Sequence, residues 1–141
     1  MKIAAISFLA LLLLPATSNG ALWIHGPENP LPGEPKWSNK AEVADLNADG
    51  WPDILFANGR GYASPGGGER NQVLMNPANS DLPWKDISAE IFGETADQTR
   101  AIKVRDFNGD GKPDIFVANT YQTQSRIYVA NGKNAFADKT A

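Results

Sequence analysis

The chain has 141 residues, which limits it to at most one domain of ordinary size. Its formal net charge at pH 7 is −3, and it lacks the stripe of lysine and arginine that marks a nucleic-acid-binding surface, so we expect no nucleic-acid partner. The absence of cysteine excludes disulfides and a cysteine-linked lipid anchor, and it leaves a bound metal ion as the other common stabiliser of a small exported domain.

Residues 1–20 have the pattern of a secretory signal peptide. Lys2 supplies the positive start, residues 3–14 form an apolar run, and Pro15 and several small residues follow. As a helix the apolar run would be about 18 Å long, which is too short for a bilayer core of roughly 30 Å. We therefore expect no stable membrane span, with a short membrane anchor as the alternative. The expected location is secreted, periplasmic or at the cell surface.

Residues 21–39 contain four prolines, at positions 27, 30, 32 and 35. Proline interrupts helices and central strands, so this segment is predicted to be an extended lead-in.

An internal repeat follows the lead-in. The nonapeptide DLNADGWPD at residues 45–53 recurs as DFNGDGKPD at residues 106–114, 61 positions later. The strand-like segments that follow each nonapeptide also match one another, with an insertion in the first copy. We therefore divide the remainder of the chain into a first repeat at 40–99 and a second at 100–141.

Each repeat contains four short segments rich in β-branched or aromatic residues and bounded by glycine, asparagine, aspartate or proline. The predicted strands are 40–44, 54–58, 73–76 and 84–87 in the first repeat, and 101–105, 115–119, 126–130 and 136–138 in the second. No segment has a useful length of helical periodicity. The longest helix candidate is 89–99, and Gly93 argues against it.

A period of about sixty residues with four strands in each unit predicts an all-β fold of two four-stranded antiparallel blades of the β-propeller type. Propellers usually contain four to eight blades, so the two blades are expected to belong to a larger propeller. The sequence given ends at Ala141, where a third unit would begin. Two expectations follow: a fragment of a longer protein with further repeats, or assembly with itself or with a partner.

The nonapeptide places oxygen-bearing side chains at positions 1, 3, 5 and 9 and a glycine at position 6, which permits a tight turn. The residue at position 7 can add its backbone carbonyl. This all-oxygen set favours calcium over zinc, which prefers cysteine and histidine, and over magnesium, which demands a near-ideal octahedron. The predicted ligands of two calcium sites are Asp45, Asn47, Asp49, the Trp51 carbonyl and Asp53, and Asp106, Asn108, Asp110, the Lys112 carbonyl and Asp114.

Two alternatives to this metal loop were weighed. An EF-hand loop needs glutamate at position 12, where this chain has Phe56 and Val117, and it continues into a helix rather than a strand. The remaining alternative is a hairpin turn rich in aspartate and asparagine that binds nothing.

The nonapeptide, the Ile-Leu-Phe-Ala-Asn and Ile-Phe-Val-Ala-Asn strands after it, and the Phe-x-Asp-x-Thr ending together resemble the FG-GAP/VCBS repeat family. Phe92 and Gly93 match the Phe-Gly of the family name, whereas its Gly-Ala-Pro half is not visible. The resemblance covers residues 40–141. It implies the β-propeller of integrin α-subunits and of many exported bacterial proteins, with a calcium ion in each blade and roles in adhesion, protein binding or carbohydrate binding.

The expected function is therefore an exported, calcium-stabilised repeat module for protein or carbohydrate binding or adhesion, non-catalytic by itself. The only histidine, His25, lies in the lead-in, and no nucleophile-and-base pattern is visible. The alternative is the N-terminal propeller part of an exported enzyme whose catalytic residues lie outside this chain.

Overall fold

A computed structural model describes residues 31–78 and 82–141. The predicted signal peptide and residues 21–30 of the lead-in lie outside the described residues.

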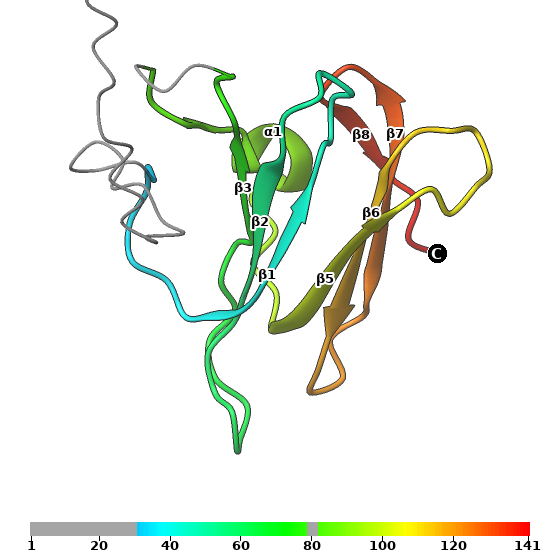
Figure 1. Ribbon diagram of the computed structural model, residues 1–141. Coiled ribbons are helices and arrows are strands. Elements are labelled where there is room, and N and C mark those ends of the chain that lie inside the picture. Colours follow the sequence, from blue (N-terminus) through cyan, green and yellow to red (C-terminus); the bar gives the residue numbers. More distant parts are fainter. Residues whose placement is uncertain (1–30, 79–81) are drawn as a thin grey trace, which may run out of the picture.

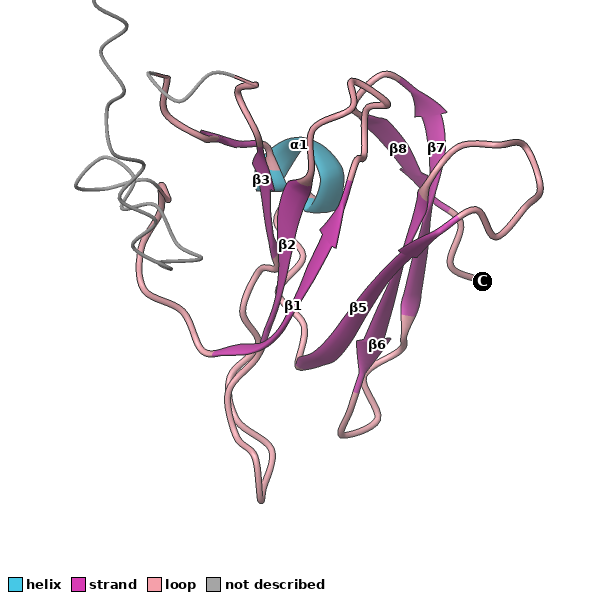
Figure 2. Ribbon diagram, viewed as in Figure 1, coloured by secondary structure: helices cyan, strands magenta, loops and turns pink. Residues whose placement is uncertain are grey.

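Two four-stranded antiparallel sheets make up the fold, with their strands in chain order, as in two blades of a propeller (Figures 1 and 2). The first sheet contains β1 (Ser38–Ala44), β2 (Asp53–Asn58), β3 (Gln72–Met75) and β4 (Lys85–Asp86). The second contains β5 (Thr99–Arg105), β6 (Asp114–Asn119), β7 (Arg126–Gly132) and β8 (Ala135–Asp138). The predicted all-β fold and all eight predicted strands are confirmed.

The strand β4 is shorter than predicted, with only two residues where 84–87 was expected. A side chain replaces the next ladder bond, because the backbone N–H of Val73 in β3 donates to the hydroxyl oxygen of Ser88 over 2.9 Å. In the second sheet the N–H of Ile127 donates to the hydroxyl of Thr140 over 3.2 Å. The Asp-x-Ser and Asp-x-Thr endings of the two repeats thus both supply a hydroxyl that accepts a hydrogen bond from the third strand of the sheet.

One helix departs from the prediction of strands only. The helix α1 (Ser88–Phe92) occupies the start of the segment in which Gly93 was expected to prevent a helix. Gly93 has φ 57° and does end the helix, but five residues fit before it. Ile91 and Phe92 are buried on its inner side, so packing rather than length stabilises α1.

The core lies between the two sheets and is closed on one side by α1. Alternation in β2 directs Leu55 and Ala57 towards the second sheet, and alternation in β5 and β6 directs Ile102 and Ile115 back towards the first. Contacts between the sheets run mainly from β1 and β2 to β5. The two repeats therefore share one core instead of having one each.

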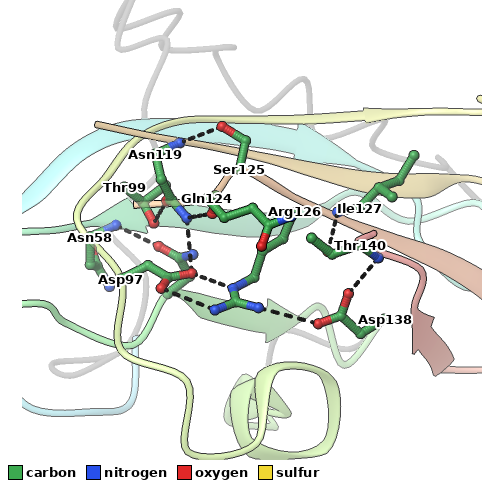
Figure 3. A network of polar contacts seen from close by, with 11 residues as sticks. Asn58, Asp97, Thr99, Asn119, Gln124, Ser125, Arg126, Ile127, Asp138 and Thr140 are labelled. Atoms are coloured by element: carbon green, nitrogen blue, oxygen red, sulfur yellow. Dashed lines mark hydrogen bonds and ion pairs between the residues drawn. The ribbon is translucent and has the colours of Figure 1, made fainter. Parts of the chain in front are cut away.

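A polar network closes the second sheet at the end where β6 and β7 are joined (Figure 3). The buried carboxylate of Asp97 accepts from Arg126 Nε over 2.7 Å and from the side-chain amide of Asn119 over 2.9 Å. Arg126 Nη1 also lies 3.5 Å from the carboxylate of Asp138 in β8. The segment that joins the repeats is thereby bound to β6 through Asn119 and to β7 through Arg126, which also contacts β8.

Equivalent β-bulges interrupt the inner strand of each sheet, between Ser38 and Lys40 in β1 and between Thr99 and Ala101 in β5. The bulged Asn39 donates its side-chain amide to the carbonyls of Gly59 and Thr99, over 2.8 and 2.7 Å. Bulges redirect side chains, and this one joins the two repeats.

Within residues 31–78 and 82–141, no helix is both long enough and apolar enough to cross a membrane.

Candidate metal-binding loops

Both predicted metal loops are hairpin connections at the same place in their sheets. The first joins β1 to β2 and the second joins β5 to β6, and position 9 of each is the first residue of the following strand. Ordered sheets therefore support both ends of each loop.

In the first loop, side-chain oxygens turn inward and bind backbone N–H groups of the same turn. Asp45 accepts from the amides of Asp49 and Gly50 over 3.1 and 2.8 Å, and Asn47 accepts from the amide of Asp49 over 2.9 Å. Asp49 itself accepts from the amide of Trp51 over 2.9 Å. The oxygens of positions 1 and 3 thus converge on one amide.

The second loop repeats this arrangement. Asp106 accepts from the amides of Gly109 and Gly111 over 2.7 and 2.8 Å. Asn108 accepts from the amide of Asp110 over 2.8 Å, and Asp110 accepts from that of Lys112 over 2.9 Å. The shared sequence pattern therefore produces the same local turn twice.

Both loops need left-handed backbone at positions 4 and 6. Position 6 is glycine in each, with φ 88° at Gly50 and 82° at Gly111. Position 4 is Gly109 in the second loop, with φ 81°, but Ala48 in the first, with φ 58°. An alanine in this region is strained by roughly 1 kcal/mol relative to its ordinary conformations.

We therefore expect Ala48→Gly to raise the free energy of unfolding by about 0.5–1 kcal/mol, because glycine adopts this φ without the clash of a Cβ atom. Urea denaturation measures the change. The matched substitution Gly109→Ala should lower stability by a similar amount, since open space surrounds the added Cβ and only backbone strain acts. Equal stability of all three proteins would contradict this account.

The aspartates at position 9 differ from the other predicted ligands, because both are fully buried. Asp53 accepts from the N–H of Leu46 over 2.9 Å and from that of Asn76, just after β3, over 2.8 Å. Asp114 likewise accepts from Phe107 over 3.0 Å and from Ala130 of β7 over 2.9 Å. Each carboxylate therefore clamps the loop start and the third strand of its sheet to the second strand, a role that sequence analysis missed.

The electrostatics of the loops favour ionised carboxylates at the exposed positions. The hydrogen bond from the Trp51 amide, followed by that from the Asn47 side chain, lowers the pKa of Asp49. The Gly111 amide has the largest lowering effect on the pKa of Asp106. Burial raises the pKa of Asp53 in spite of its two amide hydrogen bonds, and a neighbouring positive charge would oppose that rise.

The donor set at positions 1, 3, 5 and 7 consists only of oxygen, as a hard cation requires. Within residues 31–78 and 82–141, however, no three side chains of aspartate, glutamate, histidine or cysteine are grouped closely enough to hold a metal ion. In the second loop the ammonium of Lys112 lies 3.8 Å from the Asp110 carboxylate and balances part of its charge. The residues fit calcium by chemistry, and the ligand assignment stays a prediction.

Residues of both loops line one groove of about 280 Å³. Asn47 and Ala48 come from the first loop, and Lys112 and Pro113 come from the second. This proximity was not predictable from the sequence, because the loops are 61 residues apart and only the packing of the sheets brings them together.

A second cluster lies at the opposite end of the strands, on the β2–β3 and β6–β7 connections at the lower end of Figure 1. The guanidinium carbon of Arg100 lies 5.8 Å from the ring centre of Tyr62 and 5.6 Å from that of Tyr121. The Tyr121 hydroxyl donates to the Tyr62 carbonyl over 2.7 Å, and Tyr62 is 90% exposed. We call these three residues the Tyr–Arg–Tyr cluster. The contact between the insertion loop of the first repeat and Tyr121 gave no signal in the sequence.

Comparison with known proteins adds to this geometry. The model of the "FG-GAP-like repeat" family matches residues 45–117 and 106–141, and both matches begin at position 1 of a loop. Integrin alpha-6 of Gallus gallus is 31% identical over 94 residues, which are 64% of this chain and 8% of that protein.

Two human proteins give similar results. Integrin alpha-6 of Homo sapiens is 30% identical over 93 residues, covering 64% of this chain and 8% of the relative. Integrin alpha-7 of Homo sapiens is 30% identical over 95 residues, covering 65% and 8%. No solved structure shows significant similarity to the chain.

The chain thus spans about 8% of the length of these curated relatives. The family model, in contrast, covers more than half of the chain, in two overlapping matches. The chain belongs to the FG-GAP-like repeat family.

Proposed function

We propose that this chain is an exported, calcium-stabilised repeat module that binds a protein partner and is not itself a catalyst. The observation that carries the proposal is the duplicated loop, in which the same oxygen-bearing positions adopt the same turn at the start of each sheet. The apolar leader of the sequence supports export, and membership of the repeat family supports a binding role.

Bound calcium would reduce the repulsion between carboxylates in these loops. The carboxylates of Asp45 and Asp49 belong to one exposed turn, and repulsion between them is relieved by a cation bound among the loop oxygens. Extracellular calcium modules bind with dissociation constants of about 0.1–1 mM. At roughly 1 mM calcium, a site with a constant of about 0.1 mM stabilises the folded state by about 1.4 kcal/mol.

We expect calcium to raise the melting temperature by roughly 10 °C relative to chelator, because two such sites together contribute about 2.8 kcal/mol. Thermal melts by circular dichroism measure this shift. Asp45→Asn and Asp106→Asn should each remove about half of it, whereas Glu90→Gln, an exposed acid on α1 away from the loops, should leave it intact. A shift that is the same in all four proteins would rule out the loops as the source.

The Tyr–Arg–Tyr cluster is the surface that we propose for the protein partner. Tyrosine and arginine are enriched among residues that dominate protein interfaces, because they combine large apolar area with directional polar groups. The cluster is held on two connections by the Tyr121 hydrogen bond, so little conformational freedom is lost on binding.

The binding role is tested by comparing what the immobilised protein retains from an extracellular extract with and without Tyr62→Ser and Tyr121→Ser. We expect the double variant to lose retention of protein ligands while its melting temperature in calcium stays close to that of the original chain. Equal retention by both proteins would contradict the assignment of this surface. Retention that is abolished by glycosidase treatment of the extract would favour a carbohydrate ligand instead.

A further inference from the structure

The outer side of the second sheet is apolar and open. We call it the β6 face. Each of its residues has a counterpart in the first repeat, and those counterparts are covered by the second sheet. Its members are Phe107, Phe116, Ala118, Ile127 and Val129. Phe107 and Phe116 are 46% and 36% exposed, whereas their counterparts Leu46 and Leu55 are 4% and 0% exposed.

The register of the strands supports this correspondence. Phe116 lies beside Ile127 in the β6–β7 pair, just as Leu55 lies beside Val73 in the β2–β3 pair. The rings of Phe107 and Phe116 meet edge to face, with centroids 6.2 Å apart. The β6 face therefore has the same pattern as the surface on which the second sheet packs within the chain.

The outer side of the first sheet is the surface that matches the β6 face. Here we define the β1 face as Ala41, Val43, Ile54 and Phe56, which share one side of the β1–β2 pair. Their counterparts are Ile102, Val104, Ile115 and Val117, which pack in the shared core. Val43 is 63% exposed.

Among the described residues, the β1 strand of this face is open, because Ala41 and Val43 are exposed while Ile54 and Phe56 are half-buried. Within the chain, the sheets meet mainly through β1 and β2 against β5, so the equivalent contact with a neighbour uses β5 and β6 against a neighbour's β1. The lead-in around Gly33 packs against Gln72 of β3, away from β1, and leaves Val43 open.

The inner strands β1 and β5 also carry opposite charges at equivalent positions. Lys103 Nζ lies 3.0 and 3.1 Å from the two carboxylate oxygens of Glu42, across the junction of the sheets. These residues occupy the same position of the two repeats, 61 apart. If the pattern continues into a second copy, Lys103 of one copy meets Glu42 of the next, again with opposite charge. Two like charges at this position would repel one another.

We propose that the β6 face of one copy docks on the β1 face of a second copy, head to tail, with the packing that already joins the two sheets of one chain. Such an interface uses two different surfaces, so it propagates until the rotation closes a ring. Propellers close with four to eight blades, which corresponds to two to four copies. The inference rests on packing and charge and does not depend on the proposed calcium or ligand sites.

Light scattering coupled to size-exclusion chromatography tests the proposal on the full chain, expressed for export and purified. The expected result is a discrete oligomer of two to four copies. Phe116→Glu and Val43→Glu should each give a monomer, and circular dichroism should show both folded, because the two side chains are exposed in the single chain. Ser64→Glu, at an exposed position on the β2–β3 connection that belongs to neither face nor to the Tyr–Arg–Tyr cluster, should leave the oligomer unchanged.

Mixing the two monomeric variants distinguishes head-to-tail docking from other associations. The Phe116→Glu protein keeps an intact β1 face and the Val43→Glu protein keeps an intact β6 face, so the mixture should form a complex of one copy of each and stop there. A monomeric original chain at every concentration would overturn the proposal. Oligomers that survive either substitution, or a mixture without the one-to-one complex, would overturn it as well.

Discussion

Replacing Phe92 with alanine is expected to lower the free energy of unfolding by about 3–5 kcal/mol, the cost of removing a fully packed aromatic ring from a core. Phe92 is 4% exposed, and its ring meets that of Tyr128 edge to face with centroids 5.1 Å apart. Phe92 lies on α1 and Tyr128 on β7, so the substitution opens a cavity where the connection between the repeats is fastened to the second sheet.

Urea denaturation at fixed calcium measures this loss, and Phe107→Ala is the matched control. Phe107 is 46% exposed, so its removal should cost less than about 1 kcal/mol in the monomeric protein. Equal losses at the two positions would show that the Phe-Gly segment does not anchor the core as described.

Replacing Asp53 with asparagine is expected to cost about 3 kcal/mol, the second large effect. Both carboxylate oxygens of Asp53 accept backbone hydrogen bonds, and an amide offers one acceptor and one donor in their place. One buried N–H, that of Leu46 or Asn76, then loses its partner, and the other loses a charged acceptor. Burial raises the pKa of Asp53, so part of the loss is offset because asparagine carries no charge to desolvate.

Measuring the stability loss of Asp53→Asn with and without calcium shows whether Asp53 acts through its backbone hydrogen bonds or through metal binding. In chelator, Asp53→Asn should still destabilise the protein by most of the full amount, because the two amides are protein groups. Asp45→Asn, at a half-buried position of the same loop where water can replace a lost contact, should cost less in chelator and show a larger effect with calcium. Loss of stability at Asp53 that vanishes in chelator would contradict a structural role for this carboxylate.

The strands were predictable because they are determined by local sequence. Short apolar segments such as 54–58 and 115–119 alternate correctly and are bounded by turn residues, and their duplication removes most of the ambiguity of any single segment. The helix α1 was missed because five residues are too few to show a helical period, and only the burial of Ile91 and Phe92 explains it.

The turn of each candidate loop was predictable from the sequence, but the contacts of the loops with distant strands were not. Positions 1, 3, 5 and 6 act within the loop, so their spacing alone predicts a tight turn lined by oxygens. Asp53 and Asp114 reach Asn76 and Ala130 in distant strands, and the β6 and β1 faces are recognised only when burial is compared between repeats. Long-range pairing of this kind leaves no periodic trace in a single sequence.

We propose that each of the two loops binds one calcium ion, and calorimetric titration of the chelator-treated protein with calcium chloride decides whether it does. The account predicts saturable binding of two ions per chain, with dissociation constants of about 0.1–1 mM. Asp45→Asn and Asp106→Asn should each reduce the stoichiometry to one. Absence of binding up to several times that range, or two ions still bound after both substitutions, would contradict it.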